Sequence, residues 1–185
     1  MTLRTRPGEH AGQLAELRPI YQGRVAPSLL RAFDEANEAL VALIARWLPG
    51  RAVMIAAEAH LGQFDEGGAP YVMHPLRLMH LADGQDAQIT AVLHDTVEDS
   101  DWTLARLERE GFGPRIIAAL DALTRRAGES YDDFIERVAQ DPLARRVKLL
   151  DLEDNANLER IDTPTERDRA RVARYKRAIV RLRDA

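Results

Sequence analysis

The sequence predicts an all-α fold, and three observations support this expectation. Of its 185 residues, 45% are hydrophobic, 30% are charged and only 5% are aromatic, so the chain can bury a core and still cover it with charge. Ala, Leu, Arg and Glu, which favour helices, are abundant, whereas β-branched runs are scarce. Apolar residues also recur at helical spacing in several segments. We therefore expect a compact bundle of packed helices.

The first 49 residues are expected to be an N-terminal helical extension to a main domain over 50–185. Up to about residue 26, Gly and Pro are scattered through polar sequence, although a few apolar residues can form a short amphipathic helix there: Leu14, Leu17, Ile20 and Tyr21. A helix over 28–48 should follow, opening after Pro27 and closing at Pro49 and Gly50. A second helix should run from about 51 to 63.

Turn residues divide the middle of the chain. Gly67, Gly68 and Pro70 mark a loop over 64–70, and Pro75 suits the first turn of the next helix, with His74 at its cap. Further helices are expected over about 86–99 and, after a cap at residues 100 and 101, over 102–110.

Helix caps are the main signal in the last third of the sequence. A helix over about 114–126 begins at a proline. Ser130 and Asp133 resemble a capping box for a helix over 131–140, and Asp141 followed by Pro142 should start the next one, toward Asn155. A basic amphipathic helix from about Thr165 closes the chain; its basic face is either solvated and charge-balancing or phosphate-binding.

Composition excludes several classes of function. The net charge of −4 gives no general attraction to nucleic acid. Without cysteine there are no disulfides or thiolate metal ligands, so a metal site must use His and carboxylates. The sequence pattern predicts no stretch long enough to supply the ~20 apolar residues that span a bilayer, so we expect a cytoplasmic protein that binds no membrane.

The segment from His94 to Asp99 reads His-Asp-Thr-Val-Glu-Asp and carries most of the chemical signal. On a continuing helix, His94 would stack on Glu98, and Asp95 on Asp99. Adjacent His and Asp can ligate a divalent ion, and the two later carboxylates can then orient or deprotonate a water whose pKa the ion lowers. The alternative is a charged helix end with a hydrogen-bonded histidine.

Two further segments add to this signal. Residues 70–75 read Pro-Tyr-Val-Met-His-Pro, which includes His74, and residues 147–155 read Val-Lys-Leu-Leu-Asp-Leu-Glu-Asp-Asn, which includes Asp151. With His60-x-x-Gln63, these segments resemble, in order, the motifs of the hydrolase domain of the Rel/SpoT alarmone enzymes, and especially the free-standing small alarmone hydrolases. The resemblance covers about residues 50–180.

This resemblance implies a compact HD-type helical domain with Mn²⁺-dependent 3′-pyrophosphohydrolase activity. The substrate would be an alarmone such as (p)ppGpp or (p)ppApp, and the products pyrophosphate and the 5′-phosphorylated nucleotide. It implies that the metal ligands are His74, His94, Asp95 and Asp151. Glu98 and Asp99 would handle the water, and the substrate contacts would include Asn155, Arg171, Tyr175 and Lys148. For Lys148, an equally good interpretation is a lysine whose amino group reaches solvent beside the core.

The chain departs from the family pattern in the loop before His74. Asp65 and Glu66 stand where the family has a basic pair that stacks on guanine. They can accept from a base amino group, with Phe64 stacking in place of arginine, or they can form a solvated turn. Other hypotheses therefore stay open: a phosphatase for the 2′-phosphate of NADPH or for a nucleoside monophosphate, and a nucleotide-binding module without turnover. A homo-oligomer formed through residues 28–48 is also possible.

Overall fold

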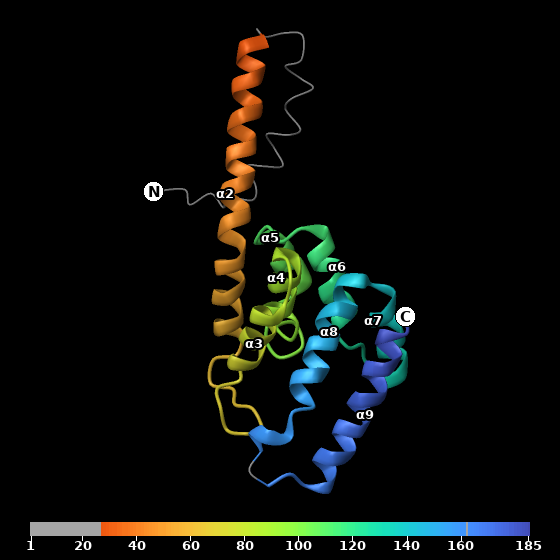
Figure 1. Ribbon diagram of the computed structural model, residues 1–185. Helices are drawn as coiled ribbons and strands as arrows, with labels where there is room; N and C mark the ends of the chain where they lie inside the picture. Colours follow the sequence, from red (N-terminus) through yellow and green to blue (C-terminus); the bar gives the residue numbers. More distant parts are fainter. Residues whose placement is uncertain (1–26, 162) are drawn as a thin grey trace.

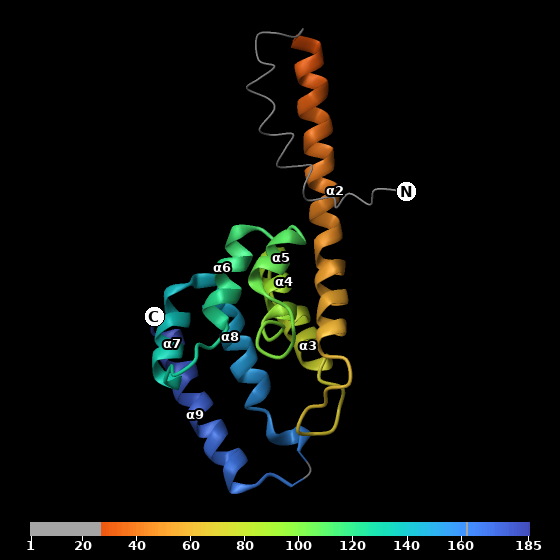
Figure 2. The same cartoon turned by 180° about the vertical axis from the view of Figure 1, so that it is seen from behind.

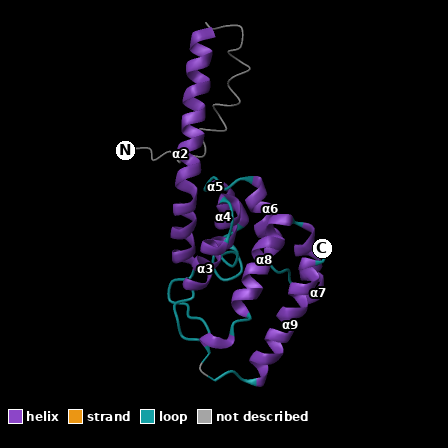
Figure 3. Cartoon of the chain, in the orientation of Figure 1, coloured by secondary structure: helices purple, strands orange, loops and turns teal. Residues whose placement is uncertain are grey.

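The computed structural model describes residues 27–161 and 163–185, and these residues form helices joined by loops and turns, apart from a single bridge between Phe64 and Pro70 (Figure 3). The expected short helix around Leu14 to Tyr21 lies outside the described residues. Over the described part of the chain, the all-α prediction is confirmed.

The helices are, in chain order, α2 (Pro27–Ala59), α3 (Met73–Leu81), α4 (Gln85–Leu93), α5 (Leu104–Arg109), α6 (Pro114–Leu123), α7 (Tyr131–Gln140), α8 (Pro142–Asn155), the short 3₁₀ helix η1 (Leu158–Arg160) and α9 (Glu166–Arg183). α4 lies at the centre of the body and packs against α2, α3, α6 and α8, while α9 packs against α7 and α8. The N-terminal part of α2 extends away from this body as an arm, in both the front and the rear view (Figures 1 and 2).

Two apolar clusters meet along α4. One joins the C-terminal half of α2 to α4, α5 and α6, and includes the fully buried residues Ile55, Ile89 and Leu107. The other joins α3, α6, α7, α8 and α9 around Leu78 and Phe134. Because α4 contributes to both clusters, the turns that follow it are held firmly, and these turns carry His94 and Asp95.

The expected break at Pro49 and Gly50 is wrong, because α2 is continuous through both residues. A proline inside a helix costs about 3 kcal/mol, since it removes one backbone hydrogen bond and crowds the previous turn. Beyond it, Ala52, Ile55 and Ala56 are completely buried against the body. Burying an isoleucine alone stabilises by roughly 1.5–3 kcal/mol, so packing of the second half outweighs the local cost.

By length and composition, α2 can cross a membrane over Asp34–Ala59. The expectation that no segment is apolar enough is therefore wrong. A core helix of a soluble protein meets the same criterion. Ile55 and its neighbours are buried in the body, so the C-terminal part of this stretch packs in the core.

Four other helix boundaries also differ from the expected ones. α4 ends at Leu93, not at Asp99, and residues 94–99 form turns. α3 begins at Met73, so His74 lies within its first turn and is buried, not projecting freely from a cap. α5 is capped by Thr103, whose side chain accepts from the amide of Arg106, and not by residues 100 and 101. α6 ends at Leu123, before the expected residue 126.

The last three expected helices are confirmed at their N-terminal caps. Ser130 accepts from the Asp133 amide, Asp141 accepts from the amides of Leu143 and Ala144, and Thr165 forms a capping box with Asp168. These caps satisfy amides that have no partner within their helix.

Candidate metal centre

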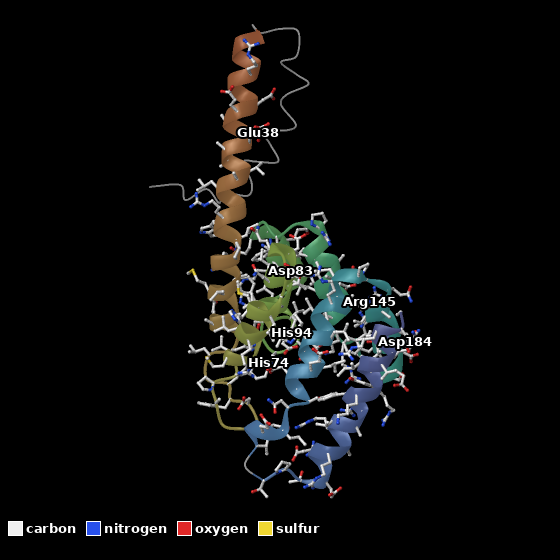
Figure 4. All side chains as sticks on the ribbon, viewed as in Figure 1. Glu38, His74, Asp83, His94, Arg145 and Asp184 are labelled. Carbon is white, nitrogen blue, oxygen red and sulfur yellow. The ribbon has the colours of Figure 1, made fainter. Side chains whose placement is uncertain are left out.

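Two imidazoles face each other at the centre of the body. His74, from the first turn of α3, and His94, just after α4, lie edge to face with ring centroids 5.2 Å apart, and Figure 4 shows both side chains in the same region. Both residues are only 2% exposed. Suitable ligand atoms of His74, His94 and Asp95 all lie within 4.8 Å of one another. The Asp151 Oδ1 atom is 3.1 Å from His74 Nε2 and 3.6 Å from His94 Nε2. The four residues expected to be ligands are thus close together.

Each imidazole is held so that its Nε2 atom faces this centre. His94 Nδ1 lies 2.8 Å from the carbonyl oxygen of Ala91, to which it donates. His74 Nδ1 lies 2.7 Å from Asp154 Oδ2. A donating Nδ1–H leaves the Nε2 lone pair for a metal, and carboxylates commonly orient metal-binding histidines in this way.

The donor set fits a divalent cation. His94 Nε2 is buried and makes no hydrogen bond to any described residue, although Asp95 Oδ2 lies only 2.9 Å away. A nitrogen lone pair facing carboxylate oxygens needs a cation or a proton between them. Two imidazoles and carboxylates suit a six-coordinate ion such as Mn²⁺, Fe²⁺ or Co²⁺ and leave positions for further ligands. The cluster is thus compatible with a divalent cation.

Without a cation, protons take that place. Burial favours the neutral ring, but Asp95 and Asp151 raise the pKa of His94 to about 10. Burial likewise opposes ionisation of Asp95, yet His94 lowers the pKa of Asp95 to about 2. Burial also favours neutral His74, while its hydrogen bonds to Asp151 and Asp154 raise its pKa. A metal that binds here must displace these protons.

Asp151 has additional partners on α8. Lys148 Nζ is 2.6 Å from Asp151 Oδ2, and Asn155 Nδ2 donates to Asp151 Oδ1 at 2.5 Å. Burial disfavours the charged amine, but Asp151 and Asp95 raise the pKa of Lys148. The alternative in which this amino group reaches solvent is wrong, because the Lys148 side chain is only 14% exposed.

The turns at residues 94–99 separate the two carboxylates that were expected to work together. Glu98 shares a hollow with Asp95 and accepts from the Arg125 amide at 2.5 Å. Asp99 lines a different hollow, beside Trp102. Burial and the nearby Asp95 raise the pKa of Asp99. Asp99 nevertheless stays close to Asp95, whose carbonyl oxygen accepts from the Asp99 amide at 3.0 Å.

Two cavities flank the candidate metal centre, and both are lined by Asn155 and Tyr175. We call them the loop cavity and the basic cavity. The loop cavity, of about 300 Å³, lies beside His74 and is lined by Phe64, Asp65, Glu66, Gly67, Tyr71, His74, Asn155, Asn157, Ile161, Arg171 and Tyr175. The basic cavity, of about 310 Å³, lies beside Asp95 and is lined by Asp95, Glu98, Arg125, Tyr131, Phe134, Lys148, Asp151, Leu152, Asn155, Arg174 and Tyr175. All six residues expected to contact substrate line one or both cavities.

The acidic loop residues have separate structural partners. Asp65 Oδ1 accepts from the amides of Gly67 and Ala69 at 3.0 and 2.9 Å, as the turn interpretation predicts. Glu66 pairs with both terminal nitrogens of the Arg171 guanidinium. The basic face of α9 is also largely charge-balanced, since Arg181 pairs with Glu136 and Arg183 with Glu153.

Sequence reasoning assigned no role to three residues that hold candidate site residues in place, although Tyr71 and Gln63 lie in the motifs that carry the resemblance. Arg77 donates to both Asp154 oxygens at 2.9 Å and so fixes the carboxylate that orients His74. The Tyr71 hydroxyl donates to Asp95 Oδ2. Gln63 Nε2 donates to the carbonyl oxygen of Asp99 at 3.0 Å. For Asp154, the sequence offered one local indication of a role at the site: it lies three residues after Asp151, which places both on one helix face.

Comparison with known proteins gives sequence relatives and a structural one. No protein-family model matches the chain. A guanosine-3′,5′-bis(diphosphate) 3′-pyrophosphohydrolase of Aquifex aeolicus is 34% identical over 117 residues, which are 57% of this chain and 17% of the relative. A protein of Haemophilus influenzae with the same name is 36% identical over 78 residues, or 39% of this chain and 11% of the relative. A GTP pyrophosphokinase of Myxococcus xanthus is 29% identical over 181 residues, which are 82% of this chain and 24% of the relative.

The chain therefore spans at most about a quarter of the length of these curated relatives. A solved structure described as a metazoan ortholog of SpoT that hydrolyses ppGpp superposes with a TM-score of 0.62 at 24% identity, covering 73% of this chain and 84% of that one. That match confirms the expected HD-type helical fold. The chain is thus similar in sequence to part of enzymes named for hydrolysing guanosine-3′,5′-bis(diphosphate), and similar in fold to the solved SpoT ortholog.

Proposed function

We propose that this chain is a metal-dependent hydrolase that removes the 3′-pyrophosphate of an alarmone nucleotide such as guanosine 3′,5′-bis(diphosphate). The observation that carries the proposal is the pair of buried imidazoles whose Nε2 atoms face Asp95 and Asp151, at the junction of two cavities. Its relatives are named for making or for hydrolysing such nucleotides. A cluster of His and carboxylate ligands supports hydrolysis, because it suits attack of water on phosphorus.

We assign the metal ligands as His74, His94, Asp95 and Asp151, and the ion as Mn²⁺ by resemblance. When bound there, the ion would polarise a phosphoryl oxygen and lower the pKa of the attacking water. Glu98, in the same cavity as Asp95, is the group placed to accept a proton from that water. By resemblance we keep Asp99 as the second residue that handles this water, although it lines a different hollow; Gln63 donates to its carbonyl oxygen.

The charges of the two cavities set the orientation of the substrate. The basic cavity contains Lys148 together with the guanidinium groups of Arg125 and Arg174. These cations favour a diphosphate group, and the candidate ligands Asp95 and Asp151 line the same cavity, so we place the 3′-pyrophosphate that is removed there. The nucleoside then occupies the loop cavity, where Phe64 and Tyr175 offer aromatic faces and Asn155 lies between the two ends. Water adds to the phosphorus attached to the 3′ oxygen, the bond to that oxygen breaks, and the oxygen takes up a proton.

The test is incubation of the purified protein with Mn²⁺ and guanosine 3′,5′-bis(diphosphate), with products separated by anion-exchange chromatography. We expect pyrophosphate and guanosine 5′-diphosphate in equal amounts. Release of orthophosphate from NADPH or from a nucleoside monophosphate, with no pyrophosphate from any 3′-pyrophosphorylated nucleotide, would replace the proposal with a phosphatase. Nucleotide binding without turnover would replace it with a binding module.

A variant experiment links the activity to the site. Glu98→Gln keeps the size of the side chain but removes the proton acceptor, and we expect kcat to fall by about 10²–10⁴-fold. Glu108→Gln is the matched control, because Glu108 is exposed on α5 and lines neither cavity. Equal losses in both variants would contradict the assignment.

A further inference from the structure

The loop before α3 is tied to α9 by two residues that line the loop cavity. Glu66 makes a two-pronged ion pair with Arg171, although 105 residues separate them. Asp168 lies 3.1 Å from the same guanidinium. Arg171 therefore has two carboxylate partners, and hydrogen bonding to Glu66 raises its pKa further.

Glu66 is held in this position by the structure of its own loop. Asp65 accepts from two amides of the loop, and the Gly68 amide donates to the Asp65 carbonyl oxygen at 2.9 Å. Gly68 has a φ of 80°, a conformation that residues with a Cβ rarely adopt. A bridge between Phe64 and Pro70 closes the base of the loop. The carboxylate of Glu66 is thus presented to Arg171 by a turn with its own hydrogen bonds.

The two cavities consequently differ in charge. Among the described residues that line the loop cavity, the charged groups are Asp65, Glu66 and Arg171, apart from the candidate ligand His74. Two carboxylates and one already paired guanidinium leave this end with no surplus positive charge. In the basic cavity, Arg125 and Arg174 lie over the rings of Phe134 and Tyr131 and make no ion pair with a described residue. Asp95, Glu98 and Asp151 also line the basic cavity, but Asp95 and Asp151 are candidate metal ligands, so Arg125 and Arg174 are the cations that remain for phosphate at this end.

We propose that Glu66 is a specificity-determining residue that selects against phosphate groups at the 5′ end of the substrate. The inference rests on the proposed function, in which the nucleoside and its 5′ substituents occupy the loop cavity. A 5′-phosphate there meets two carboxylates, and it can gain Arg171 only by displacing Glu66 from the guanidinium. Each added 5′-phosphate charge therefore weakens binding. The favoured substrates are nucleoside 3′-pyrophosphates with a 5′-hydroxyl or a single 5′-phosphate.

The experiment compares three guanosine 3′-pyrophosphates that carry a 5′-hydroxyl, a 5′-monophosphate or a 5′-diphosphate, with kcat and KM measured separately for each. For the native protein we expect KM to rise by about threefold to tenfold with each 5′-phosphate, which is the effect of one partly exposed charge. In Glu66→Gln this dependence should flatten or reverse, because Arg171 loses one of its partners and one negative charge leaves the cavity. Glu108→Gln should retain the native dependence.

A double variant distinguishes a specific ion pair from a general change in charge. Glu66→Gln should lower KM for the 5′-diphosphate substrate. If Glu66 acts by occupying Arg171, then most of this decrease should disappear in the double variant that combines Glu66→Gln with Arg171→Gln. The proposal is overturned if Glu66→Gln changes KM by the same factor for all three substrates, or if the native protein binds the 5′-diphosphate best. Thermal unfolding of each variant verifies that it is folded.

A binding experiment can test the role of Glu66 even if the proposed function fails. If no 3′-pyrophosphate is hydrolysed, the proposed function fails, but the same charge rule can still be measured. Isothermal titration of the native protein and Glu66→Gln with guanosine, guanosine 5′-monophosphate and guanosine 5′-diphosphate then gives dissociation constants. Affinity that falls along the series in the native protein but not in the variant supports the inference, and parallel trends in both overturn it.

Discussion

Asp154 provides the sharpest test of how the centre is built, because it touches the candidate ligand His74 without facing the cavities. Its Oδ2 atom is 2.7 Å from His74 Nδ1, and both its oxygens accept from Arg77 at 2.9 Å. Asp154→Asn retains an oxygen acceptor but removes the charge that orients the ring. Loss of such a supporting carboxylate typically weakens metal binding by about 10–100-fold, or roughly 1.4–2.7 kcal/mol.

The same substitution also affects folding. It breaks one of the two hydrogen bonds from Arg77, whose side chain is 34% exposed, so solvent screening reduces the loss to about 1 kcal/mol. Metal affinity should therefore fall by more than stability does. Titration calorimetry with Mn²⁺ measures the first quantity, and urea unfolding of the metal-free protein measures the second.

Glu153→Gln is the matched control for this prediction. Glu153 is the preceding residue on α8, is exposed, and pairs with Arg183 at 2.7 Å, away from both imidazoles. It should bind Mn²⁺ with native affinity. If Asp154→Asn also binds Mn²⁺ with native affinity, then the hydrogen bond to His74 does not organise a metal site, and our account of this centre is refuted.

Three further predictions concern stability. Arg137 donates to three carbonyl oxygens and to Glu129, so Arg137→Met should lower the free energy of unfolding by about 2–4 kcal/mol in urea; a loss below 1 kcal/mol would contradict the role of this network. Hydrogen bonding to Arg137 lowers the pKa of Glu129 from 4.5 to about 2, so its stabilisation is present above pH 4.5 and is lost as pH falls toward 2. The melting temperature of Glu129→Gln should fall less over that interval than that of the native protein, and parallel curves would disprove it. Ile55→Ala should lower the free energy of unfolding by about 2–4 kcal/mol because Ile55 is fully buried. Met54→Ala, at a residue that is 63% exposed, should lower it by less than about 0.5 kcal/mol. Equal losses would show that this part of α2 is not core.

Local rules were reliable where a side chain satisfies the backbone next to it. The helices that begin after Ser130, Asp141 and Thr165 start at the expected residues because each cap accepts from amides two or three residues ahead. Local rules failed at Pro49 and after Leu93. At Pro49, distant packing outweighs a local cost. After Leu93, the His94 ring takes the Ala91 carbonyl oxygen that a continuing helix would have used.

The sequence by itself determined the all-α class, the types of residue at the candidate centre and the family resemblance, because these depend on composition, spacing and motif order. Only the tertiary structure decided that Asp154 and Arg77 orient His74, that Glu98 and Asp99 face different hollows, and that Glu66 pairs with Arg171. These contacts join residues that can be more than 70 positions apart, such as His74 and Asp154. Their geometry follows from how α3, α4, α8 and α9 pack around a shared core, and no local pattern specifies that packing.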